Sequence, residues 1–189
     1  MSTTQNAISF PGFDSPAVGF EVPLEMLSAC HSRVERQCQT LRRLVPHLAA
    51  NGPDQAAREA ALAVLRYFDT SARHHHADEE EDLFPALLQF APAVELAPLQ
   101  QLIDALLAQH RELELAWTQV RWMLEGIWLG TAPELGADEV AHMVGLYERH
   151  IAREEEELLP LAKRVLGDAQ LDVVGRAMRL RRGIKDSSI

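Results

Sequence analysis

Residues 73 to 85 read R-H-H-H-A-D-E-E-E-D-L-F-P, which sets three histidines against five consecutive carboxylates. Residues 150 to 160 read H-I-A-R-E-E-E-E-L-L-P and match the first stretch when the two are aligned 75 positions apart. In both, a histidine is followed after four residues by a glutamate, then by a leucine and a proline. A solvated charge run has no reason to repeat in this way, and a purification tag would be a terminal run. The repeat therefore predicts a shared structural role.

Each of these stretches follows an isolated histidine on an earlier segment. The sequences His31-Ser-Arg-Val-Glu35 and His110-Arg-Glu-Leu-Glu114 share the frame His-x-x-aliphatic-Glu. The chain is thus predicted to consist of two helical hairpins, each with one isolated histidine and one His-x-x-x-Glu pair.

The spacing of apolar residues between the motifs is typical of helices. It predicts four long helices, at about residues 24–51, 54–90, 97–129 and 138–166. Pro85 lies inside the second, where we expect a bend or a local break. A short fifth helix is expected after Asp168, which would cap it, and before Gly183. Since no stretch alternates with period two, the predicted fold class is all-α, an antiparallel four-helix bundle.

The predicted organisation is one domain with short extensions. Residues 1–20 are interpreted as an extended N-terminal arm, residues 21–183 as the bundle with its short fifth helix, and residues 184–189 as a tail. The net charge is -10, and two acidic runs, 78–82 and 154–157, supply nearly all of the excess. We therefore expect no binding to nucleic acid or to an anionic membrane surface.

The two cysteines bear on the cellular compartment. Cys30 and Cys38 lie about 12 Å apart along one predicted helix, which is too far for a disulfide. The sequence has no basic-then-apolar leader and no apolar run near the length of a membrane helix. We therefore expect a cytoplasmic protein.

The motif spacing also predicts a metal centre. Residues four apart on a helix project from one face, so each His-x-x-x-Glu pair can present a nitrogen and a carboxylate to one point. Helical arms of similar length around each turn bring the isolated histidines to the same level of the bundle. Burial of these groups unpaired would be costly, and a dinuclear metal centre removes that cost. The predicted ligands are His31, His75, Glu79, His110, His150 and Glu154.

Imidazole and carboxylate ligands without thiolate suit iron or manganese and leave zinc possible. If two six-coordinate ions take these side chains and one bridging oxygen, two positions remain for water, dioxygen, peroxide or a further side chain. Three residues are candidates for such a side chain: His76, Glu35 and Glu114. For the two glutamates, surface ion pairing is the commoner role. Tyr147, one turn before His150, could line a ligand pocket, although core packing is the commoner role. We expect His74 to point away and the acidic residues after each central glutamate to be mostly solvated.

The pattern H...HxxxE...H...HxxxE resembles the hemerythrin-like (HHE cation-binding) family over roughly residues 24 to 165. The stretches Pro11-Gly12-Phe13-Asp14 and Pro23-Leu24-Glu25-Met26-Leu27 are similar to a bacterial, single-domain subset. The resemblance implies an up-and-down bundle around an oxo- or hydroxo-bridged di-iron site. Oxygen-storing members carry a histidine and an aspartate where this chain has Glu114 and Glu155, which argues against reversible dioxygen carriage. Ferritin-like proteins use the reversed order, Glu-x-x-His.

The resemblance implies a non-haem di-iron protein that binds or responds to a small oxidant, such as dioxygen, peroxide or nitric oxide, or to iron. Two alternatives stay open. The same centre suits a catalase-like enzyme that disproportionates peroxide. It also suits an interaction module that metal binding folds.

Overall fold

The computed structural model describes residues 19–132 and 134–184. Most of the predicted N-terminal arm, including Pro11-Gly12-Phe13-Asp14, and nearly all of the predicted tail lie outside these residues. Within the described residues the regular structure is entirely helical, with no strand. The prediction of an all-α fold is confirmed.

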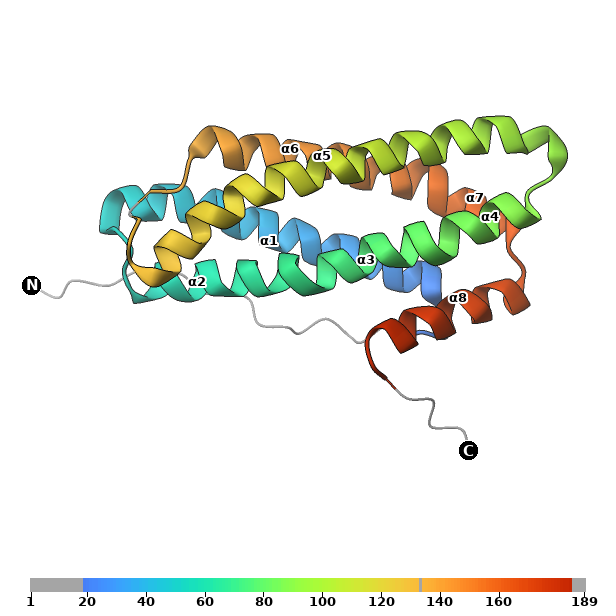
Figure 1. The fold of residues 1–189 in the computed structure, drawn as a ribbon, viewed down its shortest axis with the longest axis horizontal. Helices are drawn as coiled ribbons and strands as arrows, with labels where there is room; N and C mark the ends of the chain where they lie inside the picture. The colour runs from blue at the N-terminus through green and yellow to red at the C-terminus, as the bar shows by residue number, and fades with distance from the viewer. Residues whose placement is uncertain (1–18, 133, 185–189) are drawn as a thin grey trace, which may run out of the picture.

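Four rods run antiparallel to one another along the long axis of the molecule (Figure 1). The first and third rods are single long helices, α1 (Pro23–Asn51) and α5 (Leu96–Leu129), the latter entered through a short 3-10 turn, η3 (Ala93–Glu95). The second rod comprises α2 (Gln55–Arg66), η1 (Tyr67–Ala72), α3 (Arg73–Ala77), η2 (Asp78–Leu83) and α4 (Phe84–Phe90). The fourth comprises α6 (Ala137–Arg153), η4 (Glu154–Leu158) and α7 (Leu159–Val165).

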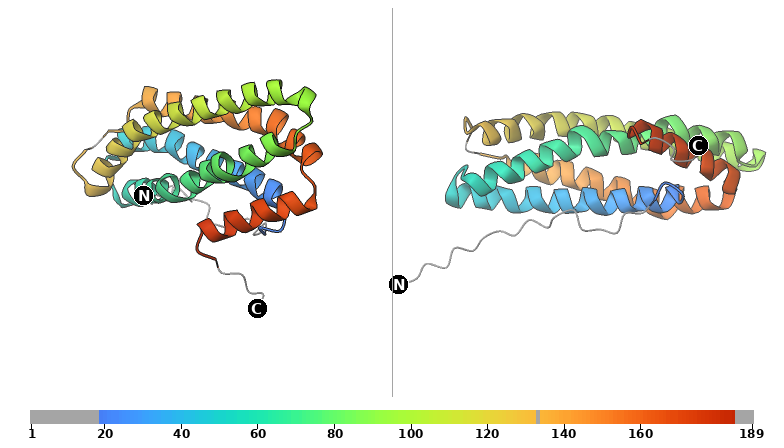
Figure 2. Two further views of the ribbon diagram at one scale, coloured as in Figure 1. Left: turned by 45° about the vertical axis from the view of Figure 1, so that its right-hand side comes forward. Right: turned by 90° about the horizontal axis from the view of Figure 1, so that it is seen from below.

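A fifth helix, α8 (Asp168–Arg181), lies outside the four rods, as the turned views make clear (Figure 2). It contacts α1 and the η2 segment. Asp168 was predicted to cap this helix, which is wrong: Gly167 occupies the capping position in extended backbone, and no side chain caps the first turn.

Backbone chemistry explains where the rods end. Gly52 adopts a φ of 68° directly after α1, and Gly130 adopts a φ of 73° directly after α5, a conformation that glycine reaches without steric cost. The second rod then starts at a proper cap, because the Asp54 side chain accepts a hydrogen bond of 2.9 Å from the backbone N–H of Ala57. These turns set the rods antiparallel.

The irregularity expected at Pro85 takes the form of a π turn. The η2 turn directly precedes the α4 segment that contains Pro85, and η4 directly precedes the equivalent segment with Pro160. Proline lacks a backbone N–H and its ring crowds the carbonyl one turn back, so a wider turn before it relieves both problems. Each of the two acidic runs lies on such a turn.

The bundle has two apolar cores with a polar layer between them. On α1, Leu27 belongs to one core and Val34 to the other, and His31 lies between them. On α5, Leu106 and Leu113 flank His110 in the same way. The fold therefore isolates a polar layer from water at both ends.

Candidate metal centre

The polar layer brings together all six residues that were predicted as ligands. They come from the four rods, and none is more than 2% exposed: His31, His75, Glu79, His110, His150 and Glu154. Two pairs of imidazole rings lie edge to face, with centroids 4.8 Å apart in His31–His75 and also in His110–His150. The sequence predicted this common level from the similar numbers of residues between each histidine and the adjacent turn.

Glu79 lies between the two histidine pairs. Its Oε1 atom is 3.4 Å from Nε2 of His75, and its Oε2 atom is 3.4 Å from Nε2 of His110. One carboxylate therefore offers one oxygen to each pair.

Glu154 has the same relationship to the other two histidines. Its Oε2 atom is 2.9 Å from Nε2 of His31, and its Oε1 atom is 3.3 Å from Nε2 of His150. The two glutamates therefore span the gap between the histidine pairs from both sides.

The donor atoms fall into two overlapping sets. His31 and His75 form one set with the two glutamates, and His110 and His150 form the other with the same glutamates. Within each set, all donor atoms lie within 4.8 Å of one another. Each set has the size and composition of a cation site.

The donor atoms are also short of partners. Nε2 of His31, His110 and His150 and both carboxylate oxygens of Glu79 and Glu154 are buried without a hydrogen-bond partner in the described part of the chain. Buried polar atoms without partners are costly and rare in folded proteins. A bound cation would satisfy all of them at once, and imidazole with carboxylate is a donor set that transition metals accept. The residues present fit a metal cofactor.

The Nδ1 atoms of His31 and His110, on the side of each ring away from the centre, are hydrogen-bonded to carboxylates. Nδ1 of His31 donates a 2.6 Å hydrogen bond to Glu155, and Nδ1 of His110 donates a 2.7 Å hydrogen bond to Glu80. Such contacts fix the ring orientation and leave Nε2 as the free donor atom. The expectation that Glu80 and Glu155 are simply solvated is wrong. Each directly follows a central glutamate on a π turn, and the helical period of the sequence gives no signal of such a turn.

The two remaining histidines differ from each other. Nδ1 of His150 donates to the side-chain oxygen of Gln109 at 3.1 Å. Nδ1 of His75 is buried and has no partner in the residues that the structure describes. Gln109 precedes His110, and the equivalent residue before His31 is Cys30. The two hairpins are alike at the central ligands but differ here, because Gln109 accepts a hydrogen bond from His150 whereas His75 has no such partner in the described residues.

Burial and mutual charge set the protonation of the centre when no cation is bound. Burial lowers the pKa of His75 well below its usual value and that of His150 to about 4, so both imidazoles are neutral and able to bind metal. Burial opposes the charge on His31 too, but the nearby carboxylate of Glu154, with an oxygen 2.9 Å from Nε2, outweighs it and raises the pKa of His31 to about 9.

The two central carboxylates titrate differently. Burial, followed by repulsion from Glu154, raises the pKa of Glu79 well above its usual value. Burial acts on Glu154 in the same direction, but His150 and His31 outweigh it and lower the pKa of Glu154. Without a cation, the environment therefore favours the protonated form of Glu79 and the ionised form of Glu154.

Other candidate residues are divided between the centre and the surface. Glu35 is exposed, and Glu114 turns outward to pair with Arg111 at 2.9 Å, which confirms the surface reading of Glu114. Tyr147 is buried, with its ring 5.4 Å from that of Phe68, as expected of a core residue. His76 lies beside His110, and a third donor set joins it to His110 and His150.

A cleft of about 510 Å³ reaches this layer from the surface. It lies between the second rod and α5, and its lining includes His76 and Tyr147. Its charged lining has both signs, among them Arg73, Glu80 and Arg111. The cleft offers a route for small molecules from solvent to the His76 side of the centre.

The sequence reading missed a buried carboxylate beside the centre. Asp78 is fully buried, and both Arg181 and Arg182 of the C-terminal segment donate hydrogen bonds to it. These contacts attach α8 to the turn that carries Glu79. Asp78 and its two arginine partners lie about a hundred residues apart in the chain.

Comparison with known sequences identifies the family. The sequence model described as hemerythrin HHE cation binding domain matches residues 22–162. The chain belongs to this family. An uncharacterized protein of Haemophilus influenzae is similar to this HHE chain, with 34% identity over 164 residues, which cover 87% of this chain and 92% of that protein. The resemblance seen in the sequence motifs is confirmed, and the histidine and glutamate cluster is able to hold metal.

None of the helices in the described ranges of this HHE chain combines the length and the apolar character needed to cross a membrane. Cys30 and Cys38 are both buried and unpaired, as their separation predicted.

Proposed function

We propose that this HHE protein holds two non-haem iron ions in the polar layer and binds a small oxidant there, namely dioxygen, peroxide or nitric oxide. The observation that carries the proposal is the position of Glu79. One of its oxygens lies 3.4 Å from Nε2 of His75, and the other lies 3.4 Å from Nε2 of His110, which belongs to the other histidine pair. A carboxylate placed in this way suits a pair of cations better than a single one.

We infer iron because this donor set accepts it and because the sequence motifs resemble those of hemerythrin-like proteins. The set holds imidazoles and carboxylates and no thiolate, since Cys30 is absent from every donor group within the described residues. Manganese and zinc accept the same donors, so metal analysis has to decide among the three. When bound, two irons would supply redox chemistry and coordination positions open to a small ligand.

The side chains around the centre have separate tasks. The four central histidines and two glutamates bind the cations, and Glu80 and Glu155 orient two of the rings. The apolar cores above and below the layer exclude water, which strengthens electrostatic contacts inside it. The cleft beside His76 admits the oxidant. The free thiols of the chain suit a reducing cytoplasm, which is the location we propose.

The first test is elemental analysis of protein purified without a histidine tag. We expect about two irons per chain, and a stable content of one or none would overturn the proposal. Anaerobically reduced protein is then exposed in turn to dioxygen, peroxide and nitric oxide while the visible spectrum is recorded. At least one of these should change the spectrum in proportion to the iron content.

The same experiment separates the two rival functions. Sustained evolution of oxygen from added peroxide would identify a catalase-like enzyme. Metal that stabilises the fold and responds to none of the three ligands would identify an interaction module. A His74→Ala variant is the matched control, because His74 neighbours the ligand segment and belongs to no donor set in the described chain.

A further inference from the structure

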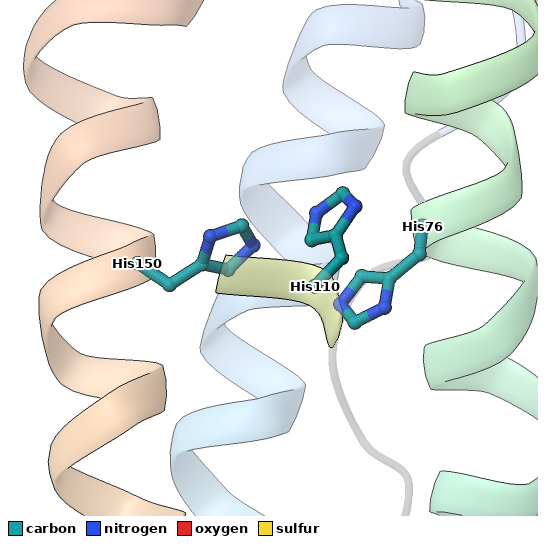
Figure 3. Close-up of side chains that lie close together, drawn as sticks. All are labelled: His76, His110 and His150. Carbon is teal, nitrogen blue, oxygen red and sulfur yellow. The ribbon is translucent and has the colours of Figure 1, made fainter. Parts of the chain in front are cut away.

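His76 stands on the cleft side of the centre and points toward it. Figure 3 shows its ring entering from α3 and approaching His110 and His150, which come from two other rods. The ring stacks on His110, with centroids 4.0 Å apart and planes inclined by 12°, and it lies edge-on to His150 at 5.7 Å. Imidazoles from three rods thus lie close together on this side of the centre.

The donor atoms of these three rings are close enough to share a cation. One ring nitrogen from each of His76, His110 and His150 lies within 4.8 Å of the other two. Nε2 of His76 is buried and has no hydrogen-bond partner in the described part of the chain. The atom thus has the same unsatisfied state as Nε2 of His110 and His150.

The other side chains near this position already have partners. Glu114 lies one turn beyond His110 on α5, but its carboxylate pairs with Arg111 at the surface. Glu80 is engaged with Nδ1 of His110 at 2.7 Å and with the guanidinium of Arg111 at 2.7 Å. His76 is therefore the side chain that faces His110 and His150 with a donor atom to spare.

We propose that His76 is a fifth imidazole ligand, which binds the same cation as His110 and His150. The inference rests on the proposed dinuclear function and adds an asymmetry to it. One cation would then have three imidazole donors, from His76, His110 and His150, and the other would have two, from His31 and His75.

The test uses three variants: His76→Ala, His76→Phe and the control His74→Ala. Phenylalanine keeps a flat ring that can stack on His110, but it removes the nitrogen. Cobalt(II) is the probe, because its visible bands report the number of ligands and its titration gives the stoichiometry. A chelator competition gives the affinity of each of the two sites.

We expect both His76 variants to bind one of the two cobalt ions at least tenfold more weakly than the parent. Loss of a residue that only orients a ligand already weakens metal binding by about 10–100-fold, and loss of a ligand itself should weaken it at least as much. The other ion should keep its affinity. The visible bands of the weakened site should also change, and His74→Ala should match the parent in all respects. Circular dichroism of the metal-free variants checks that they fold.

Two results would overturn the inference. If His76→Phe keeps both affinities and the cobalt spectrum of the parent, His76 contributes packing and not a ligand, whatever His76→Ala does. If both variants match the parent, His76 has no role at the centre. In either case a parent protein that binds two ions leaves the proposed function intact, whereas a parent that binds fewer than two rejects both.

Discussion

Nδ1 of His31 lies 2.6 Å from a carboxylate oxygen of Glu155, which belongs to the other half of the chain. The reciprocal contact joins His110 of the second half to Glu80 of the first at 2.7 Å. Each isolated histidine is therefore oriented by the opposite hairpin. The two halves meet through the metal ligands and also through the residues that hold those ligands.

Replacement of Glu155 by alanine should weaken metal binding about 10–100-fold, because the ring of His31 loses the contact that fixes its orientation. Chelator competition measures the change. Glu156→Ala is the control, since Glu156 is the next residue and is exposed. Equal affinities for the two variants would show that Glu155 does not support the centre.

Replacement of Glu79 or Glu154 by alanine should lower the metal content below two ions per chain, because each carboxylate serves both donor sets. Mass spectrometry of the metals in purified protein gives the content. Glu114→Ala should retain the parent content, as its carboxylate faces solvent. Two tightly held ions in both central variants would contradict the bridging role.

The sequence predicted the rods and the six central residues because both depend on local spacing. The repeat of His-x-x-x-Glu needs only the rule that residues four apart share a helix face. That rule does not predict the positions of Glu80 and Glu155. Successive residues on a regular helix point about 100° apart, so if the central glutamate faces inward, the glutamate that follows it should not. The π turns η2 and η4 change this geometry, and helical periodicity does not reveal them.

The contact between Asp78 and α8 was unpredictable for another reason. It joins residues about a hundred positions apart, and it depends on how a short helix docks against the bundle. Local patterns give the existence of α8 and say nothing of its partner. The position of His76 likewise depended on tertiary packing, because spacing alone placed it beside a ligand without fixing its direction.

Metal binding at pH 7.5 should release protons. The pKa of His31 is raised to about 9, so this imidazole is mainly protonated without metal, and burial and repulsion from Glu154 raise the pKa of Glu79, which favours its protonated form. Both groups must lose their protons to bind a cation. Affinity should therefore increase as the pH rises toward 9 and fall as it drops. Calorimetry in buffers of different ionisation enthalpy measures the release, and no buffer dependence would contradict the assignment.

Replacement of Arg182 by alanine should destabilise the protein by about 1.5–3 kcal/mol, because a buried carboxylate loses one of its charged hydrogen-bond partners. Removal of Arg181 as well should cost more, since Asp78 is then buried without a partner. Urea unfolding of the metal-free protein measures both. The control is Arg176→Ala on the same helix, where an exposed pair with Asp172 is worth at most about 1 kcal/mol. Equal midpoints for all variants would mean that α8 is not held by these charges.

The crossed contacts at the centre bear on the ancestry of the chain. A precursor of half this length could have assembled the same constellation on the twofold axis of a homodimer, because each hairpin supplies what the other one requires. Duplication and fusion of its gene would have made the two copies inseparable and free to diverge. Cys30 and Gln109 occupy equivalent places in the two hairpins, and Gln109 accepts a hydrogen bond from His150, so after such a duplication this position would be one at which the copies had diverged.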